Sequence, residues 1–332
     1  MQTDWGSEQF NGRVKMERCW FLGPTVISLG TLAERCKISI PWFERMTQSE
    51  APLHELGLRA IPEQAVNELV DTIIREQGPS AITNWAKEAG VAQSSSLSLH
   101  WGERSIVDVV RRVAETSLLD HNIACLGTYE TADHLTIFLL PEEDTPKWVH
   151  LFFLTLMAEG VAKYNDDGHL VEDIGFGGAL DESVDEGIDK QCWHELQTPL
   201  NEPSWVRYKA SRLSAGTVFS SESWALITRS LLNPIVGLRY RSSSWRYKTQ
   251  AFFCRELAGS SELNMPKAAE FMNVDVSTLR RHLSAEGTSF RKLLADFRVR
   301  LGAILRMQNV EESERCELLD FSSSTSLKRL GL

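Results

Sequence analysis

Apolar and polar positions change their period along this chain, and the change predicts two kinds of structure. Two apolar stretches rich in β-branched residues, Ile123 to Tyr129 and Leu135 to Leu140, flank the polar segment Glu130 to His134. This pattern predicts an antiparallel hairpin. Between residues 288 and 305 apolar side chains recur three and four positions apart, which predicts a helix. The sequence therefore indicates an α+β fold class, with a mixed α/β N-terminal domain followed by an all-α C-terminal domain.

Helical patterns also occur on both sides of the predicted hairpin. Leu53 to Gly78 contains a turn at Gly57 and a helix from Pro62 to Arg75, and a further helix is predicted from Ile106 to Thr116. The most apolar run, Trp148 to Met157, is too short to span a bilayer, so we interpret it as a buried helix.

The segment Asn264 to Arg298 has the pattern of two short helices that cross at a tight turn. Such a crossing needs a small side chain at the contact point, here Ala269, and a left-handed residue in the turn, here Asn273. Asparagine tolerates left-handed backbone better than most residues. Asn264 and Asp275 are suitable N-caps. The inward apolar positions, interrupted only by His282, are Ala268, Met272, Val274 and Leu279.

The outer face of the second short helix carries Ser277, Arg280 and Arg281 near its N-terminal half. Arginine can donate two hydrogen bonds to guanine at once, and a helix in this position can enter the major groove. The alternative is a solvated helix face, which is the usual role of an isolated Arg-Arg pair. The flanking helix-turn-helix pattern favours direct contact with DNA.

A longer helix is predicted to begin at Thr288 or Ser289. Its first turn contains Arg291, which joins the candidate DNA-binding residues. Its apolar stripe faces a core and consists of Phe290, Leu293, Leu294, Phe297, Leu301, Ile304 and Leu305.

With these residues in view, the phrase TLRRHLSAEGTSFRKLL resembles the DNA-binding domain of AraC/XylS-type transcriptional regulators. In that family one long helix joins two helix-turn-helix units, which insert into successive turns of the major groove. The resemblance implies double-stranded DNA as a partner, with Ser277, Arg280 and Arg281 as the first reader. It also brings in a second copy of the chain and RNA polymerase as further partners.

The segment Glu314 to Leu330 resembles the family's second unit only in part. Cys316 stands at the small-residue position and Arg329 at a frequent arginine, which makes Arg329 a candidate DNA contact. Arg315 replaces a buried aliphatic residue, and Asp320 replaces the turn glycine. We therefore expect a second unit that is truncated or degenerate, and weaker binding than two intact units would give.

The N-terminal region has a weaker resemblance to the effector-binding domain of an AraC subgroup, which implies an unidentified small-molecule effector and no cofactor. The predicted division is an effector-binding and dimerisation domain at residues 1–238, a linker at 239–249, and the DNA-binding domain at 250–332. The segment Leu238 to Thr249 alternates cations with aromatic residues. It is either a solvated linker that enters a helix from Trp245 to Leu257, or a source of phosphate contacts.

Charge divides the chain in the same way. The whole sequence has 35 Lys and Arg against 45 Asp and Glu, a net charge of −10. Residues 262–309 carry eight basic and five acidic side chains, about +3, whereas residues 310–332 carry three and five, about −2. The remaining −11 lies in the first 261 residues, which suits a sensor better than a DNA surface.

Other chemistry is weakly indicated. The six cysteines are scattered, which suits a reducing cytoplasm. Cys192-Trp193-His194 lacks the second pair of ligands that a zinc site needs, and Gly175-Phe176-Gly177-Gly178 lacks the context of a dinucleotide fingerprint and is interpreted as a mobile loop. No nucleophile or general base stands out, so we expect no enzyme activity and no metal.

The leading hypothesis is a cytoplasmic transcriptional regulator without a membrane partner. Whether it is an activator or a repressor stays open, with activator as the working assignment. Two alternatives remain: a truncated regulator that dimerises without specific DNA binding, and a small-molecule-binding protein with a structural helical tail.

Overall fold

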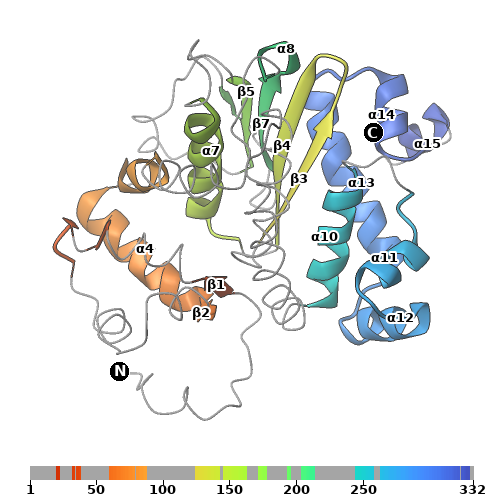
Figure 1. The fold of residues 1–332 in the computed structure, drawn as a ribbon, viewed down its shortest axis with the longest axis horizontal. Helices are drawn as coiled ribbons and strands as arrows, with labels where there is room; N and C mark the ends of the chain where they lie inside the picture. Colours follow the sequence, from red (N-terminus) through yellow and green to blue (C-terminus); the bar gives the residue numbers. More distant parts are fainter. Residues whose placement is uncertain are drawn as a thin grey trace, which may run out of the picture.

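The computed structural model describes residues 20–22, 32–33, 35–38, 60–78, 80–87, 124–142, 145–162, 171–177, 193–195, 203–213, 244–257, 262–321 and 323–329. Within these ranges every strand lies before residue 210, and every element after residue 244 is a helix (Figure 1). The predicted mixture of helices and a mainly antiparallel sheet is confirmed.

The centre of the molecule is a five-stranded sheet with the strand order β3-β4-β7-β5-β6. Its strands are β3 (Ala124–Glu130), β4 (His134–Pro141), β7 (Ser204–Lys209), β5 (Val171–Phe176) and β6 (Trp193–Glu195). Neighbouring strands are antiparallel except for the parallel pair β5 and β6. A separate two-stranded sheet pairs β1 (Trp20–Leu22) with β2 (Ala60–Pro62).

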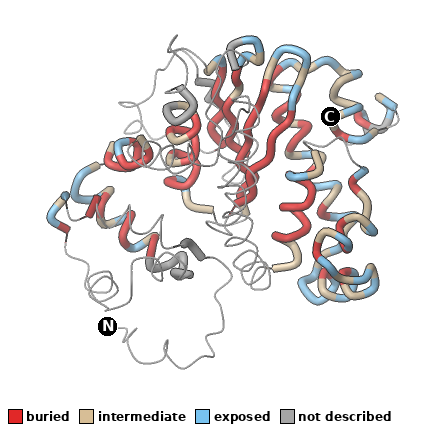
Figure 2. The backbone as a smooth tube through the Cα atoms, viewed as in Figure 1, coloured by how far each residue is buried: buried red, intermediate tan, exposed pale blue. Residues whose placement is uncertain are grey.

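The predicted hairpin is confirmed as β3 and β4, which pair from Glu130 opposite Leu135 to Ala124 opposite Pro141. Almost every residue of both strands is buried, on either side of the pleat (Figure 2). A sheet that is covered on both faces selects continuous apolar strands, not alternating ones. Helices must therefore pack on both faces of this sheet.

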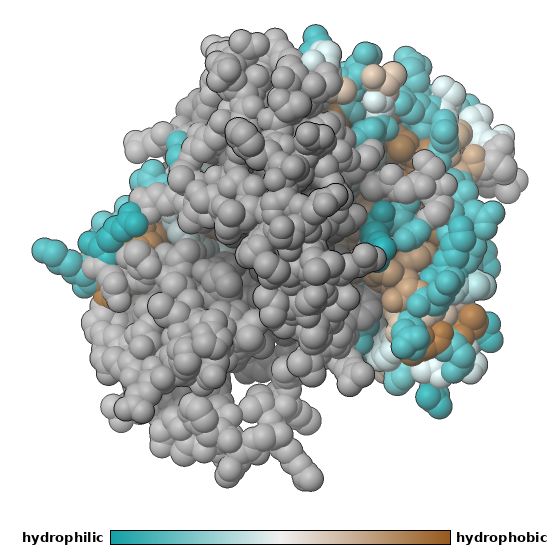
Figure 3. Space-filling view, viewed as in Figure 1, coloured by the Kyte–Doolittle hydropathy of each residue, from teal (hydrophilic) through white to brown (hydrophobic). Residues whose placement is uncertain are grey.

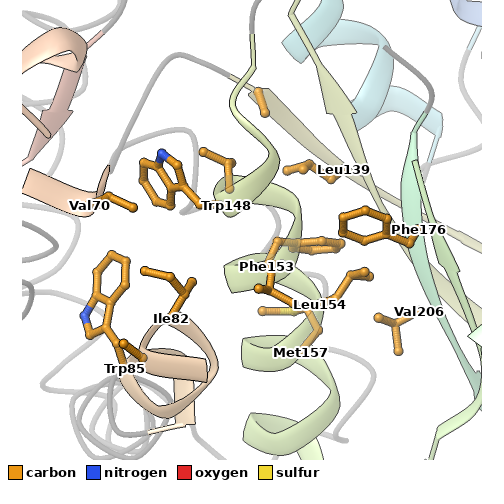
Figure 4. Close-up of a cluster of buried hydrophobic side chains, with 14 of the residues drawn as sticks. Val70, Ile82, Trp85, Leu139, Trp148, Phe153, Leu154, Met157, Phe176 and Val206 are labelled. Atoms are coloured by element: carbon orange, nitrogen blue, oxygen red, sulfur yellow. The ribbon is translucent and has the colours of Figure 1, made fainter. Parts of the chain in front are cut away.

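One face of the sheet is covered by α7 (Lys147–Ala162), and α4 (Glu63–Gln77) lies outside it with residues 80–87 (Figure 1). The predictions of a buried helix near residues 148–157 and of a helix near 62–75 are confirmed. The Trp85 ring contacts Phe152, with ring centroids 4.1 Å apart, and Trp148 donates its indole N–H to Asn67 at 2.9 Å. Figure 4 shows this layer, where Phe153, Leu154 and Met157 point from α7 toward Phe176 and Val206 of the sheet.

The other face of the sheet is covered by α10 (Trp245–Leu257). Side chains of α13 (Phe290–Met307) belong to the same hydrophobic cluster as this face and α10. The Phe253 ring lies 5.2 Å from Phe290 and 5.3 Å from Phe297, measured between centroids. These rings share one core with sheet side chains, namely Cys125, Tyr129, Phe138, Leu140 and Trp205. The C-terminal helices and the sheet are thus parts of one hydrophobic core.

A buried polar contact adds to this apolar packing at the C-terminal end of α13. The amide oxygen of Gln308 accepts hydrogen bonds from Tyr129 at 2.5 Å and from Thr136 at 3.1 Å, and its backbone oxygen accepts one from Arg207 at 3.1 Å. Arg300 donates to the Pro141 carbonyl at 2.8 Å. Because these bonds join specific atoms of α13 to three strands, they fix its position on the sheet.

The helix that the sequence predicted from Trp245 to Leu257 is confirmed at both ends as α10. Residues 245–249 of the predicted linker are therefore its first turns. The eight consecutive residues Tyr247 to Cys254 are all buried. A helix that is buried on all sides lies between two layers, so these residues do not act as a loose connection.

Several other predictions concern different parts of the chain. The predicted turn at Gly57 and the predicted helix from Ile106 to Thr116 lie outside the described residues, as does Gly178. Gly175 and Phe176 belong to β5, so the interpretation of this segment as a mobile loop is wrong for these two residues. Among the described helices, none combines the length and apolar character needed to cross a membrane.

Two glycines of the sheet lie under aromatic rings from the neighbouring strands. Gly127 is opposite Phe138, and Gly175 is opposite Trp205. A Cβ atom built at either glycine would overlap the ring. Both rings are completely buried, so they have little room to move. The glycines therefore allow two large aromatic residues to lie flat on the sheet beneath α10 and its neighbours.

We predict that Gly175→Ala lowers the free energy of unfolding by about 1–3 kcal/mol, because the added methyl group displaces the Trp205 ring in a closely packed core. Urea denaturation followed by circular dichroism measures the change. Lys209→Ala, at the exposed end of β7, is the control and should change stability by less than about 0.5 kcal/mol. A Gly175→Ala variant as stable as this control would contradict the packing argument.

Candidate nucleic-acid interface

The helix pair predicted from the sequence is present as α11 (Met265–Phe271) and α12 (Val276–Ala285). Asn264 caps α11 by accepting a hydrogen bond from the Lys267 N–H at 3.0 Å. Asp275 caps α12 and accepts from the Thr278 N–H at 2.8 Å. Both N-cap predictions are confirmed, and each satisfies an N–H group that the helix itself leaves without a partner.

The turn between the two helices has the left-handed residue that the sequence predicted. Asn273 has φ 52°. Its N–H donates to the Glu270 carbonyl at 2.9 Å, and the Val274 N–H reaches back to the Ala269 carbonyl at 2.9 Å. Ala268 and Ala269 are buried, which lets the helices approach closely. The crossing geometry of a helix-turn-helix is thus set by one asparagine and two alanines.

The three predicted readers lie on the exposed face of α12. Ser277, Arg280 and Arg281 are all exposed. The Ser277 hydroxyl donates to the Asp275 carboxylate, which also accepts from Thr278. These hydrogen bonds hold the pKa of Asp275 well below its usual range, so this cap stays ionised. Ser277 therefore helps to build the helix start, and the two arginines remain for outside contacts.

Three arginines of α12 and of the first turn of α13 differ from the arginines farther along α13 in whether they have partners. In the described part of the chain, Arg280, Arg281 and Arg291 have no ion-pair or hydrogen-bond partner for their guanidinium groups. By contrast, Arg298 pairs with Asp320 at 3.0 Å and Arg300 lies 4.0 Å from Asp296. Unpaired exposed guanidinium groups can bind an anion without first breaking an internal contact. On the face of the molecule that Figure 3 shows, the coloured surface at the right carries many hydrophilic side chains, interrupted by hydrophobic areas.

The inner side of α12 contacts the N-terminus of α10. The Glu286 carboxylate accepts hydrogen bonds from the Trp245 N–H at 2.9 Å and the Arg246 N–H at 2.8 Å. The His282 ring stacks on the Trp245 indole, with centroids 4.2 Å apart and planes 5° apart. This stacking explains why a histidine interrupts the apolar inward positions. Sequence reasoning missed these contacts, since the partners lie about forty residues apart in the chain.

Two cations of the predicted linker have structural roles that neither sequence interpretation foresaw. Arg246 lies 3.7 Å from Glu142, the residue that follows β4. Lys248 is buried, and its ammonium lies 4.3 Å from the centroid of the Trp245 ring. Burial lowers the pKa of Lys248 to about 8, although Glu286 acts in the opposite direction. Lys248 is thus withdrawn from solvent, and the half-buried Arg246 is engaged with Glu142, so both have partners inside the protein. Arg239 and Arg241 lie outside the described residues.

A second helix pair, α14 (Glu312–Leu318) and α15 (Ser324–Arg329), repeats the turn of the first pair. Asp320 has φ 54°, and the Phe321 N–H donates to the Cys316 carbonyl at 2.8 Å, in the same relation as Val274 and Ala269. Leu319 and Leu327 anchor the pair in the core. The turn therefore forms although aspartate replaces glycine, and the Arg298 guanidinium binds both the side chain and the carbonyl of Asp320.

The two helix pairs differ in charge. The first pair with its caps, residues 264–289, carries three Lys and Arg against three Asp and Glu, and Arg291 and Lys292 at the start of α13 bring the net charge of 264–292 to about +2, whereas residues 311–329 contain three against five, about −2. Lys328 of α15 lies 3.6 Å from Glu312. Arg329 is the last residue of α15, and its side chain lies outside the described residues. The first pair is the better site for a polyanion.

The structure also brings together a histidine and a serine that sequence reasoning did not pair. His150 of α7 lies 2.7 Å from Ser204 of β7, between Nδ1 and Oγ, and the Gly177 N–H donates to the same oxygen at 2.9 Å. Both side chains are buried, and burial lowers the pKa of His150 to about 4, so its ring is neutral at pH 7. The contact joins α7 to two strands inside the core. Among the described residues no group of three potential ligands could hold a metal ion.

No protein-family model matches this sequence, and no curated protein matches it. One solved structure, the transcriptional regulator CdpR from Pseudomonas aeruginosa, aligns with 92% of this chain and 93% of its own, at 13% identity and a TM-score of 0.39. A likeness this distant carries no argument about function, which has to come from the helix pairs themselves.

We predict that two substitutions of Asn273, in the turn between α11 and α12, differ in their effect on stability. Asn273→Ala should lower the free energy of unfolding by about 1 kcal/mol. The left-handed backbone at this position is unfavourable for alanine, which lacks the polar side chain that makes it tolerable for asparagine. Asn273→Gly should stay within about 0.5 kcal/mol of the original protein, since easier left-handed geometry offsets a more flexible unfolded chain. Urea denaturation measures both, with Glu270→Ala on exposed α11 surface as the control. Equal loss from alanine and glycine would show that the backbone angle is not limiting.

Proposed function

We propose that this chain is a transcriptional regulator that binds double-stranded DNA sequence-selectively by inserting α12 into the major groove. One observation carries the proposal: Arg280 and Arg281 project, exposed and without partners among the described residues, from the second helix of a capped helix-turn-helix. A helix presented in this way is the element that reads base edges in this motif.

The chemistry of the site supports assigning separate roles to its residues. Arg280 and Arg281 would contact guanine edges through bidentate hydrogen bonds. Ser277 would contact the backbone or a base through the lone pairs that its bond to Asp275 leaves free. Arg291, exposed in the first turn of α13, would neutralise a phosphate next to the reading helix.

The second helix pair would contribute less to this binding. The two pairs lie at opposite ends of α13 (Figure 1), whose 18 residues span roughly 27 Å. That length is shorter than one turn of DNA, roughly 34–36 Å, but of the same order, so both pairs could approach one side of a duplex. However, the net negative charge of α14 and α15 opposes contact with phosphate. The proposal therefore places most of the affinity and specificity in α12, with Arg329 as a secondary contact.

The N-terminal sheet region would control this binding in response to a small-molecule effector, in a cytoplasmic homodimer that acts with RNA polymerase and has no enzyme activity or cofactor. These parts of the proposal are supported by the sequence resemblance. An effector would act by binding one arrangement of the sheet and the helix pairs more tightly than another. The acidic second pair favours one alternative, a regulator that dimerises without specific DNA binding.

We predict that the purified chain selects a common site from a pool of genomic fragments at physiological salt, and that Arg280→Ala with Arg281→Ala abolishes the selection. Each lost bidentate contact should cost about 1–3 kcal/mol, so affinity for the selected site should fall at least tenfold. The affinity is measured by fluorescence anisotropy with a labelled duplex.

The matched control is Arg35→Ala with Arg75→Ala, which removes the same charge from exposed positions in the N-terminal region. It should retain selection of the site. If neither the original chain nor the control enriches any sequence, the protein is not a sequence-selective DNA-binding protein. If all three proteins select the same site equally well, DNA is read by residues outside α12.

A further inference from the structure

The reading helix is attached to the sheet through one compact group of side chains, which we name the Trp245 cluster: Trp245, Lys248, His282 and Glu286. Trp245 and Lys248 belong to the first turn of α10, while His282 and Glu286 belong to the last turn and the C-cap of α12. The cluster is therefore the place where the end of the reading helix meets the start of the helix that covers the sheet.

Glu286 acts on both helices at once. Its two carboxylate oxygens accept the N–H groups of Trp245 and Arg246, which are among the donors that α10 cannot satisfy internally. A negative charge at a helix N-terminus is also favoured by the helix dipole. Ser244 already accepts the Tyr247 N–H at 3.0 Å, so α10 has a local cap of its own. The additional cap from Glu286 is the one that comes from the DNA-reading unit.

The Trp245 indole is enclosed between two groups. His282 covers one face of the ring in a nearly parallel stack. Because that face is occupied at 4.2 Å, the Lys248 ammonium, 4.3 Å from the same centroid, must lie over the opposite face. Stacking and cation–π contacts both depend on ring orientation. The indole therefore fixes the rotation of α12 about its own axis, and with it the direction of Arg280 and Arg281.

The same turn of α10 contacts the sheet. The Tyr247 hydroxyl donates to the Ala124 carbonyl at 3.5 Å, and the Cys125 thiol donates to the Tyr247 carbonyl at 3.9 Å. Arg246 extends to Glu142, the residue after β4. The first turn of α10 thus lies between α12 on one side and β3 and the end of β4 on the other. A displacement of either strand has to pass through only this turn to reach α12. Packed and hydrogen-bonded groups of this kind transmit shifts because they have discrete arrangements, not continuous ones.

We infer that Glu286 and Trp245 are positioning residues for DNA recognition, which hold α12 at a fixed angle to the sheet and transmit changes in the sheet to the DNA-reading face. This inference deepens the proposed function and rests on it. It assigns to the Trp245 cluster the regulation of binding by the N-terminal region.

Glu286→Ala distinguishes a positioning role from a purely electrostatic effect of the carboxylate, because the two predict opposite changes in DNA affinity. Removing a negative charge near a DNA-binding surface strengthens binding if only charge matters. Loss of a positioning contact weakens binding to the selected site instead, and we expect about five- to tenfold, the equivalent of one helix cap. Affinity for a duplex of unrelated sequence should not fall, because every candidate phosphate contact is retained.

The matched control is Glu270→Ala, which removes the same charge from an exposed position of α11 without touching α10. It should bind the selected site as well as the original chain or better. Glu286→Gln keeps one acceptor oxygen and should restore part of the affinity, and Trp245→Phe, which keeps a smaller stacking ring, should bind better than Trp245→Ala. Circular dichroism confirms that each variant is folded. If Glu286→Ala binds the site as tightly as Glu270→Ala, the inference is wrong.

A second measurement keeps the inference separate from the proposed function. If the original chain binds no DNA site, the proposed function fails, and amide hydrogen exchange then tests the attachment of α12 directly. Glu286→Ala should speed exchange in both α12 and the first turn of α10, whereas Glu270→Ala should leave α10 unchanged. Unchanged exchange in α12 after Glu286→Ala would overturn the inference without any reference to DNA.

Discussion

The structure depends on the burial of α10 between the central sheet and the C-terminal helices. Eight consecutive residues of this helix are buried, so it has no solvent face along most of its length. Phe252 and Phe253 contribute apolar area to the core, and each fully buried ring is worth about 1.5–3 kcal/mol. Undocking the helix would expose aromatic surface on the sheet and on α13 together. The sheet and the helix pairs are therefore held in a defined relation by the hydrophobic effect, not by a flexible connection.

Hydrogen bonds and ring stacking at two ends of the helical region define more narrowly how the helices are oriented on the sheet. At one end Gln308 joins α13 to the strands through Tyr129 and Thr136, and at the other end Glu286 and His282 join α12 to α10. Apolar packing alone allows small rotations, whereas hydrogen bonds and ring stacking select one of them. A regulator built in this way would convert a small change in the sheet into a changed direction of the reading helix.

The two helix pairs show that similar backbone geometry can accompany different chemistry. Asn273 and Asp320 occupy left-handed turns with the same hydrogen-bond pattern, and alanine or cysteine fills the close contact in each. Yet Arg280 and Arg281 of the first pair are exposed without partners among the described residues, while the turn of the second pair binds Arg298 internally. Under the proposed function, the helix-turn-helix shape would bind DNA only where its cations are left available, as they are on α12.

The sequence by itself determined the features that depend on neighbouring residues: the caps Asn264 and Asp275, the left-handed Asn273, the ends of α10, and the hairpin of β3 and β4. Each follows from backbone preferences or apolar periodicity over a few positions. Only the tertiary structure decided that Lys248 is buried, that His282 stacks on Trp245, and that the sheet is covered on both faces. These contacts join residues tens to well over a hundred positions apart, such as Tyr129 and Gln308. No local period encodes them, because they arise from which surfaces meet when the helices pack on the sheet.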